Sequence, residues 1–596
     1  MKQEYVMGNE AIALGALSAN VNLVSGYPGT PSSEIIETIY KRKPEDLYLE
    51  WSVNEKAALE VAAAAAYSGA RSMVTMKQVG LNVASDPLMS LAYVGVKGGM
   101  VVVSADDPGP ISSQTEQDTR RFAEFARIPV FDPSSVEESY EMIRDAFDYS
   151  EKYCTPVIFR PTTRVDHAYA SITTQETFEV KKYDGFVKDS KKWVIFPRLS
   201  YENHAKIEER NKKISDDFST YRFNTVTGNS KKAVLTSGVS YAYAKEFLKE
   251  YPDIKIIKIA TAYPFPDKFV LKALEGTDEV LCFEELSPYL EESLLKLIGA
   301  NRLDIKVSGK LNGCVPASGE NSADLAADVI GRFLGLNVQK ENVLSKPKLP
   351  ARYPVLCAGC PHRASFYAVK VAMKGKKTYY CGDIGCYTLG NAMPLDMVDT
   401  CLCMGAGVTM AQGFNRVDKD AKAFAFIGDS TFFASGITGV VNAVYNEADI
   451  TICILDNSTT AMTGHQPHPG TGKTMMGDVV QKVSITDVLT AIGVKKVVKV
   501  NPFELSKAIS AVNDCVSEKG VKAIIFKAPC IAVSKKKAPC KLSDKCVNCK
   551  KCIMETGCPA LSVSDGKVVI DENLCNGCML CAQVCPMNAI GGKCDE

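Results

Sequence analysis

The sequence lacks an excess of charge of either sign: Lys and Arg number 69, Asp and Glu number 69, and the formal net charge is +0. Proteins that bind nucleic acid normally carry a basic face, so this balance argues against that class. No apolar run approaches the ~18 residues that a membrane-spanning helix requires. The N-terminus has Glu4 where an export signal has basic residues, and Asn20 and Asn22 interrupt the first apolar stretch. We therefore expect a cytoplasmic protein with no membrane or nucleic-acid partner.

Cysteine is absent before Cys154 and crowded at the other end of the chain. Of the 22 cysteines, ten lie between Cys540 and Cys594. Proteins held together by disulfides are typically short and secreted, which does not describe a chain of 596 residues without an export signal. Clustered cysteines in such a chain indicate metal ligands instead.

The length suggests about four domains at ~150 residues each. Apolar strands alternate with helical stretches in three long segments: 1–180, 232–338 and 353–533. Expected strands include residues 22–26, 100–104, 155–159, 233–238, 423–427 and 450–455, and residues 54–67 form an alanine-rich helix. This alternation predicts an α/β protein with doubly wound parallel sheets covered by helices on both faces. Three other segments complete the chain: a polar, Lys-rich connector (181–231), a link (339–352) and a cysteine-rich tail (540–596).

The tail contains a four-cysteine pattern twice. Cys575-x2-Cys578-x2-Cys581-x3-Cys585-Pro586 has the spacing of bacterial ferredoxins, and Cys546-x2-Cys549-x2-Cys552-x5-Cys558-Pro559 repeats it with a longer last gap. In ferredoxins with two clusters, the two runs exchange their fourth ligands. One [4Fe–4S] cluster would then take Cys546, Cys549, Cys552 and Cys585, and the other Cys575, Cys578, Cys581 and Cys558. A pair of zinc knuckles is the alternative. The tail resembles a two-cluster ferredoxin domain, which predicts one-electron transfer in a reducing compartment.

A candidate diphosphate site follows two apolar strands. The first strand runs into Gly428, Asp429 and Ser430, and the second ends at Asn457. Carboxylate and amide oxygens suit Mg²⁺, which shares its coordination with phosphates, and the carbonyl of Thr459 would add a third oxygen. Gly428 lets the backbone approach a diphosphate. The pattern resembles the thiamine-diphosphate motif, Gly-Asp-Gly followed some thirty residues later by Asn, with Ser430 in the third position. The alternative is an ordinary turn after a core strand.

Four further segments, taken with these motifs, carry a resemblance to a known family. They are residues 26–34 (Gly-Tyr-Pro-Gly-Thr-Pro-Ser-Ser-Glu), 54–58 (Asn-Glu-Lys-Ala-Ala), 357–362 (Cys-Ala-Gly-Cys-Pro-His) and 455–466, which contains Leu-Asp-Asn and Thr-Gly-His-Gln. Over essentially its whole length the chain resembles the 2-oxoacid:ferredoxin oxidoreductases, and within them the α subunits of the indolepyruvate branch. His465 stands where the family more usually has Gly.

The resemblance implies a thiamine-diphosphate-binding, transketolase-like fold and a role for each segment. Residues 1–180 would bind the pyrimidine ring, 232–338 would form a transketolase C-terminal-like domain, 353–533 would bind the diphosphate and Mg²⁺, and 540–596 would form the ferredoxin-like domain. Glu55 would hydrogen-bond the aminopyrimidine ring and promote deprotonation of the cofactor. Without the resemblance, Glu55 would be interpreted as a carboxylate at a helix N-terminus. Thr30 would face the substrate. Asp429, Asn457 and Thr459 would hold Mg²⁺.

A third cluster is an open question. The resemblance places Cys357, Cys360, Cys386 and Cys530 where related enzymes hold a cluster near the thiamine ring. The alternative is that these are inert buried thiols, like the neighbouring Cys381, Cys401 and Cys403.

The implied activity is oxidative decarboxylation of a 2-oxoacid, with coenzyme A as acyl acceptor, ferredoxin as electron acceptor and a smaller β subunit as partner. Aryl pyruvates such as indolepyruvate are the favoured substrates, with branched-chain 2-oxoacids or pyruvate as sibling alternatives. Two rival classes are a non-oxidative thiamine-diphosphate decarboxylase and an electron-transfer scaffold without catalysis. A dicarboxylate substrate would need a cation, which Arg71, Arg120, Arg121 or Arg363 could supply. Met73, Met76, Met89 and Met462 could line an aryl pocket or belong to the core.

Overall fold

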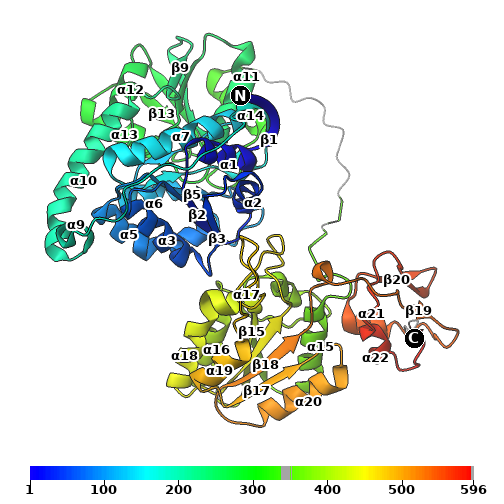
Figure 1. The fold of residues 1–596 in the computed structure, drawn as a ribbon. Helices are drawn as coiled ribbons and strands as arrows, with labels where there is room; N and C mark the ends of the chain where they lie inside the picture. The colour runs from blue at the N-terminus through cyan, green and yellow to red at the C-terminus, as the bar shows by residue number, and fades with distance from the viewer. Residues whose placement is uncertain (337–348, 351, 592–596) are drawn as a thin grey trace. The chain divides into compact units, whose positions relative to one another are not determined.

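The computed structural model describes residues 1–336, 349–350 and 352–591. Most of the predicted link at 339–352 and the end of the tail with Cys594 lie outside the described residues. The chain divides into two compact units, Met1–Lys346 and Pro347–Glu596 (Figure 1). Each unit is described by itself.

A six-stranded parallel sheet organises the first half of the N-terminal unit, in the order β3-β2-β4-β5-β7-β6. Its strands are β2 (Leu23–Gly26), β3 (Tyr48–Trp51), β4 (Ser72–Lys77), β5 (Met100–Ala105), β6 (Val130–Phe131) and β7 (Val157–Phe159). The helices around it are α1 (Gly8–Ser18), α2 (Ser33–Arg42), α3 (Glu55–Tyr67), α4 (Gln78–Val83), α5 (Ser85–Val94), α6 (Thr119–Ala126), α7 (Val136–Tyr153) and α8 (Thr163–Asp166). The alanine-rich helix is α3, as expected. Its Ala58 and Ala62 share a core with Val74 and Val102 of the sheet, because small side chains let a helix lie close to the strands.

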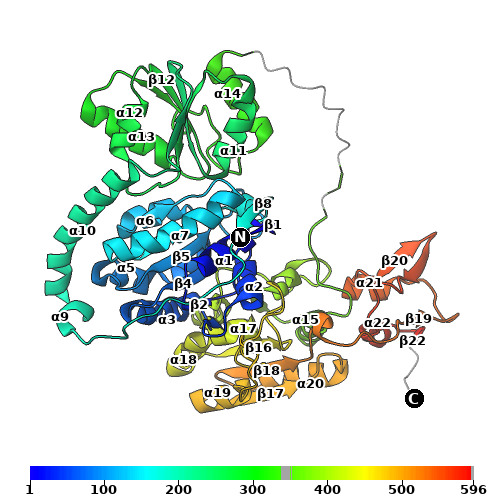
Figure 2. The same cartoon turned by 45° about the horizontal axis from the view of Figure 1, so that its top comes forward.

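A second sheet follows in the same unit, in the order β13-β12-β10-β11-β9, with only the edge strand β9 antiparallel (Figure 2). Its strands are β9 (Thr225–Thr227), β10 (Lys232–Ser237), β11 (Lys255–Ile259), β12 (Glu279–Phe283) and β13 (Lys306–Ser308). Its helices are α11 (Gly238–Phe247), α12 (Asp267–Ala273), α13 (Tyr289–Asn301) and α14 (Ala323–Leu334). A short antiparallel pair, β1 (Lys2–Met7) with β8 (Tyr169–Thr174), lies beside the first sheet.

The prediction of a connector with little periodicity at 181–231 is wrong in part. This segment contains a short helix, α9 (Ser190–Trp193), and a 22-residue helix, α10 (Pro197–Phe218). The buried residues of α10 include Leu199, Ile207, Ile214 and Phe218, and the helix packs against α5 and α12. Strand β9 also lies in the segment, so the second sheet begins before residue 232. Tertiary packing, rather than a strong local pattern, stabilises this helix.

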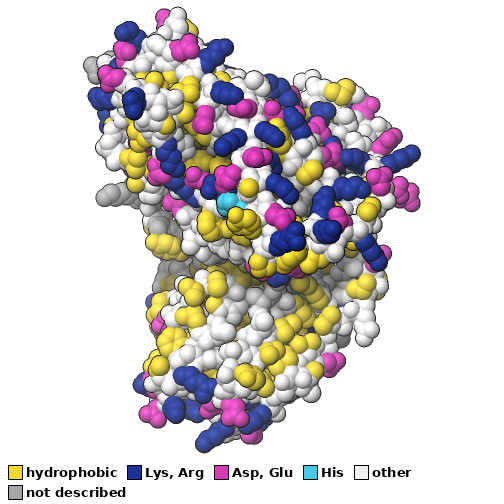
Figure 3. All heavy atoms as spheres, turned by 90° about the vertical axis from the view of Figure 1, so that its left-hand side faces the viewer, with side chains coloured by type: hydrophobic (Ala, Val, Ile, Leu, Met, Phe, Trp, Pro, Cys, Tyr) yellow, Lys and Arg dark blue, Asp and Glu magenta, His cyan; other side chains and the backbone are white. Residues whose placement is uncertain are grey.

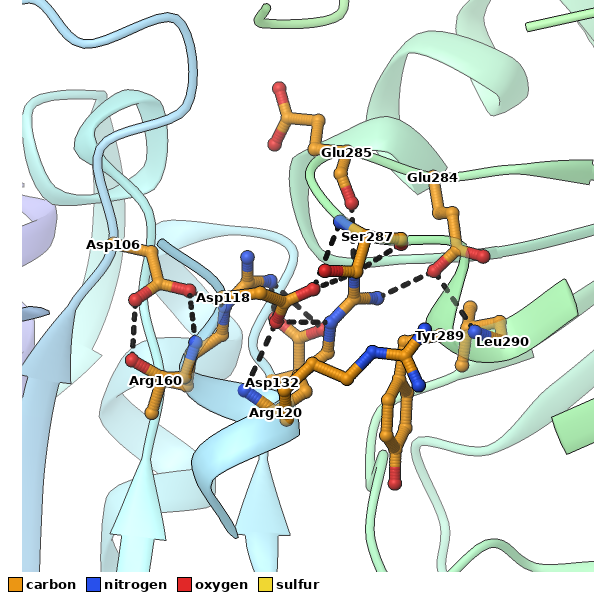
Figure 4. A network of polar contacts seen from close by, with 12 residues as sticks. Asp106, Asp118, Arg120, Asp132, Arg160, Glu284, Glu285, Ser287, Tyr289 and Leu290 are labelled. Atoms are coloured by element: carbon orange, nitrogen blue, oxygen red, sulfur yellow. Dashed lines mark hydrogen bonds and ion pairs between the residues drawn. The ribbon is translucent and has the colours of Figure 1, made fainter. Parts of the chain in front are cut away.

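A network of buried ion pairs lies where the two sheets of the N-terminal unit meet, and Arg120 connects them (Figure 4). Arg160 Nε donates to Asp106 Oδ2 at 2.7 Å, and both side chains are at most 2% exposed. Arg120 Nη1 donates across to Glu284 Oε2 at 2.8 Å, while its Nη2 pairs with Asp118 at 2.8 Å. Removing one partner would leave a buried charge uncompensated. The network therefore favours one arrangement of the two sheets.

The C-terminal unit is built on a five-stranded parallel sheet in the order β14-β15-β16-β18-β17. Its strands are β14 (Thr378–Cys381), β15 (Lys422–Gly428), β16 (Ile450–Asp456), β17 (Lys496–Val500) and β18 (Lys522–Lys527). Its helices are α15 (Pro361–Ala372), α16 (Ala406–Val417), α18 (Ile437–Tyr445), α19 (Ile485–Ile492) and α20 (Leu505–Val516). Phe424 and Phe426 of β15 belong to the core beside α15 and α20, whereas Ala425 and Ile427 belong to the core beside α16 and α18. Burial on both faces explains why this strand is apolar throughout.

The tail packs onto the sheet domain of the same unit. It consists of two short antiparallel pairs and two helices: β19 (Lys541–Leu542) with β22 (Ile590–Gly591), β20 (Leu561–Ser564) with β21 (Lys567–Ile570), α21 (Lys551–Thr556) and α22 (Leu580–Val584). Leu580 and Val584 enter the core beside α15 and α20. Gln583 donates to the carbonyl of Phe503 at 2.8 Å and accepts from the amide of Leu505 at 3.1 Å. These contacts fix the cysteine-bearing tail against the sheet domain.

Basic and acidic side chains are interspersed on the face drawn in Figure 3, as the balanced composition leads one to expect. Within the described residues, no helix combines the length and the apolar character needed to cross a membrane.

Candidate active site

Glu55 stands at the start of α3, just after β3. Asn54 caps the helix, its side chain accepting from the amide of Ala57 at 2.9 Å. Glu55 is 8% exposed and lies against Gly80, where a β-carbon would come within 2.5 Å of Glu55 Oε1. Burial raises the pKa of Glu55 to about 7, against smaller opposing effects of its own backbone amide and of Lys77. A carboxyl that titrates near neutrality suits reversible proton transfer.

Thr30 lies at the same edge of the sheet as Glu55, in the loop between β2 and α2. Its carbonyl accepts from Ser112 Oγ at 3.3 Å, and Lys77 Nζ donates to the carbonyl of Ser112 at 3.3 Å. Lys77 is thus connected to the Thr30 loop by way of Ser112. It is also close enough to Glu55 to affect the pKa of that carboxyl. Ligands of such sheets bind at the carboxyl ends of the strands, which is where these residues gather.

Asp429 occupies the corresponding edge of the C-terminal sheet, directly after β15. The side chain is 2% exposed, and its Oδ2 accepts from the amide of Ser458 at 2.8 Å. Burial alone would raise the pKa of Asp429, but His468, Asp456 and the Ser458 amide together outweigh it and hold the pKa below its usual range. The group is therefore an anion at neutral pH, as a ligand of Mg²⁺ has to be.

Asn457 follows β16 and is held beside Asp429. Its Oδ1 accepts from the amide of Thr459 at 3.2 Å, and its Nδ2 lies 3.3 Å from His362 Nε2. Burial lowers the pKa of His362 to about 4, so this ring is neutral and its Nε2 can accept from the amide. His362 therefore orients the Asn457 amide. The structure brings Asp429, Asn457 and Thr459 together, all at most 6% exposed.

His468 also belongs to this site, although no motif in the sequence marked it. Its Nδ1 accepts from the amide of Gly470 at 3.2 Å, which leaves the proton on Nε2 by this assignment. Nε2 lies 3.2 Å from Asp429 Oδ2, yet it is not aligned for a hydrogen bond with any of the described residues. The residue is 8% exposed, and its one close polar neighbour at Nε2 among the described residues is the Asp429 carboxylate. The signal in the sequence that could have pointed to His468 was the scarcity of histidine. The chain has five histidines, and His362 and His468 both lie at this site.

The glycine and serine of the motif have structural partners. A β-carbon at Gly428 would come within 2.5 Å of the Tyr387 ring, so this position has to be glycine for Tyr387 to pack there. Ser430 Oγ accepts from Thr460 Oγ1 at 2.9 Å, which connects the motif to the loop after β16. In that loop His465 has a φ of 67°, in the left-handed region that favours glycine, and this accounts for the Gly more usual there.

The tail gathers its cysteines around two cavities. One is lined by Cys546, Cys549, Cys552 and Cys585. The other is lined by Cys558, Cys575, Cys578 and Cys581, together with Cys540 and Cys360. Each cavity thus takes three cysteines from one run and the fourth from the other run. Among the described residues, no three His, Cys, Asp or Glu side chains are grouped so that they could hold one metal ion. In a four-iron cube each cysteine binds a different iron, so the sulfurs stand around a larger volume.

The third group of cysteines is less closely gathered. Burial raises the pKa of Cys386 to about 11, with further contributions from the nearby Cys530 and Cys357. The amide of Cys530 donates to the carbonyl of Asn457 at 2.9 Å, which places it beside the Asp429 site. Cys360 instead lines the tail cavity. Of the thiols compared with them, Cys381 is buried as expected, but Cys401 and Cys403 are exposed.

Comparisons with known proteins agree with this arrangement. Three family descriptions match: "Pyruvate flavodoxin/ferredoxin oxidoreductase, thiamine diP-bdg" over 14–207, "Thiamine pyrophosphate enzyme, C-terminal TPP binding domain" over 383–526 and "4Fe-4S binding domain" over 568–591. Indolepyruvate oxidoreductase subunit IorA of Methanothermobacter marburgensis is 39% identical over 98% of this chain and 97% of its own length. The subunit of that name from Archaeoglobus fulgidus is 38% identical over the same shares. The chain belongs to the IorA family.

Membership of the IorA family makes the chain an oxidoreductase subunit with thiamine diphosphate-binding and 4Fe–4S-binding domains. Among solved structures, a 2-oxoglutarate:ferredoxin oxidoreductase from Magnetococcus marinus is similar over 55% of this chain and 65% of its own, with 17% identity and a TM-score of 0.45.

The four arginines considered for a dicarboxylate substrate are all engaged in this IorA chain. Their partners are Glu151 for Arg71, Glu284 for Arg120, Glu292 for Arg121, and the carbonyls of Thr556 and Gly557 for Arg363. Met73 and Met76 are fully buried, Met89 packs against the core that contains Met76, and Met462 is 54% exposed. The first three methionines are therefore core residues, and Met462 is the one of the four that remains available to a ligand.

Proposed function

We propose that the chain is the catalytic subunit for ferredoxin-dependent oxidative decarboxylation of aryl pyruvates. Indolepyruvate, coenzyme A and two oxidised ferredoxins would give indoleacetyl-CoA, carbon dioxide, two reduced ferredoxins and a proton. The observation that carries the proposal is the 38–39% identity to indolepyruvate oxidoreductase subunits over 98% of the chain. The engagement of Arg71, Arg120, Arg121 and Arg363 by other groups supports an aryl rather than a dicarboxylate substrate.

The residues at the two sheet edges suit thiamine diphosphate and Mg²⁺. Asp429, Asn457 and Thr459 would hold Mg²⁺ through oxygen atoms, and His362 would keep the Asn457 amide in orientation. His468 Nε2, which lies 3.2 Å from Asp429 Oδ2, would donate to the diphosphate. Glu55 would exchange a proton with the aminopyrimidine ring, and Thr30 would face the substrate. When bound, thiamine diphosphate supplies the nucleophilic carbon and the electron sink.

The two tail cavities suit two [4Fe–4S] clusters, one on Cys546, Cys549, Cys552 and Cys585 and one on Cys558, Cys575, Cys578 and Cys581. We propose a smaller second subunit as partner, because the relatives are named as subunits of an enzyme. Ferredoxin would be the electron acceptor and the cytoplasm the location, with no nucleic-acid partner.

The substrate assignment is tested by kinetics of the chain produced anaerobically with its second subunit. The kcat/KM for indolepyruvate should exceed that for pyruvate by well over tenfold, since each buried CH₂ equivalent of the ring contributes ~0.8 kcal/mol. Reduction of a viologen dye that depends on coenzyme A provides the measurement. Equal or better use of pyruvate or 2-oxoisovalerate would move the chain to a sibling specificity. Carbon dioxide release without dye reduction would support a non-oxidative decarboxylase instead.

Iron content tests the number of clusters. The anaerobically purified chain should contain about eight irons, at four for each tail cluster. We expect this number because each tail cavity has a full set of four cysteines, whereas Cys360, which also interacts with Cys357, lines one of these cavities as well. A value of about twelve, falling to eight in Cys530→Ser, would show that a third cluster forms. Iron near zero would remove the tail clusters from the proposal.

A further inference from the structure

Arg363 is a buried cation between the sheet domain and the tail. It is the third residue of α15 and is 4% exposed. Its Nη1 donates to the carbonyls of Thr556 and Gly557 at 2.6 and 2.9 Å, and its Nη2 donates to the carbonyl of Leu356. The Nε–H is buried and has no partner among the described residues. All of its partners are neutral carbonyls, so they hold the guanidinium in place without cancelling its charge.

The surroundings of Arg363 are rich in sulfur. It lines the cavity that also contains Cys558, Cys575, Cys578 and Cys581, and the lining residues include no Asp or Glu within the described part of the chain. Burial lowers the pKa of Arg363, while negative charge on Cys558, Cys360 and Cys578, in that order, opposes the shift. The titratable groups that interact with this cation are therefore cysteine thiols.

The other tail cavity, lined by Cys546, Cys549, Cys552 and Cys585, has no equivalent group within the described residues. The one basic residue that lines it, among the described residues, is Lys550. Lys550 is exposed, so water and salt screen its charge. The two cavities thus differ: the positive charge beside the Cys558 cavity is buried and fixed, and the one beside the Cys546 cavity is exposed.

We propose that Arg363 raises the reduction potential of the cluster held by Cys558, Cys575, Cys578 and Cys581. This inference rests on the proposed function, because it requires that both tail cavities hold clusters. A [4Fe–4S] cluster gains one electron, and hence one negative charge, on reduction, so a buried cation stabilises the reduced form. A hydrogen bond from the free Nε–H to a cluster sulfur would act in the same direction. Of the two tail clusters, the one beside Arg363 is then reduced first.

The test is a redox titration of the iron-loaded, full-length enzyme, followed by electron paramagnetic resonance. In Arg363→Gln, the equilibrium constant for one-electron reduction of one tail cluster should fall at least tenfold, about 59 mV toward more negative potential. The other tail cluster should stay unchanged. Arg363→Lys, which keeps the charge, should show a smaller shift. Lys550→Gln is the matched control and should leave both potentials in place. Unchanged potentials in Arg363→Gln at full iron content would overturn the proposal.

A second measurement does not depend on the folding of Arg363 variants. Cys549→Ala should remove the cluster of the other cavity, and the tail potential that remains should be the higher of the two found in the unaltered enzyme. If the lower potential remains, Arg363 does not have the proposed effect. Absence of iron from the unaltered enzyme would instead contradict the proposed function.

Discussion

Asp429→Ala should weaken Mg²⁺-dependent binding of thiamine diphosphate by more than roughly 100-fold. Loss of a residue that only supports a metal ligand typically costs 10–100-fold in affinity, so loss of the ligand itself should cost more. Asp429 is buried and ionised, and water in its place would bring no charge to the bridge between metal and diphosphate. The iron content should stay the same, because Asp429 does not line either of the tail cavities.

The measurement is a calorimetric titration of the cofactor-free chain with thiamine diphosphate at fixed Mg²⁺. Asp418→Ala is the matched control, because it removes a carboxylate of the same domain that pairs with Lys377 at 2.6 Å at the opposite end of the sheet. It should bind cofactor normally. Normal affinity in Asp429→Ala would refute the assignment of the diphosphate site. Loss of iron together with cofactor would show that the variant had misfolded.

The parts of the fold that the sequence predicted are those with strong local patterns. The run Ala423–Ile427 is apolar at every position because β15 is buried on both faces, and any arrangement of the sheet would require this. The five consecutive alanines of α3 and the turn at Gly428 are similarly local. The cysteine spacing of the tail predicts two groups of four because short loops bring the sulfurs to the same place.

The features that the sequence left hidden depend on contacts between distant residues. In α10 the buried residues are spread among many charged ones, so the pattern alone does not show which face packs against α5 and α12. Arg363 could be considered a substrate cation until the structure showed it bonded to carbonyls 193 and 194 residues away. His468 lies in a loop rich in Pro and Gly, and its place beside Asp429 follows from how that loop folds back. Neither propensity nor periodicity carries such information.

Glu55→Gln should keep most of the cofactor but slow its activation by roughly 10²–10⁴-fold, the usual contribution of acid–base catalysis. The glutamine can fill the same space beside Gly80 and still form a hydrogen bond, but it cannot accept and return a proton. The direct measurement is the rate of hydrogen–deuterium exchange at the reactive carbon of bound thiamine diphosphate, read by NMR after acid quenching. Glu60→Gln, on the same helix in an exposed pair with Lys56, is the control and should exchange at the normal rate.

The pH dependence of the free energy of unfolding provides an independent test of Glu55. The pKa of Glu55 is about 7 in the folded chain against 4.5 for an unperturbed glutamate, so the folded state holds the extra proton between these values. The unaltered chain should therefore lose stability relative to Glu55→Gln as pH rises from about 4.5 to about 7, by roughly 3 kcal/mol in total, and no further above that. Thermal unfolding of the cofactor-free proteins at pH 5 and pH 8 measures the difference. If exchange is slowed but this difference in stability does not change with pH, Glu55 is not the buried proton-exchanging group described above.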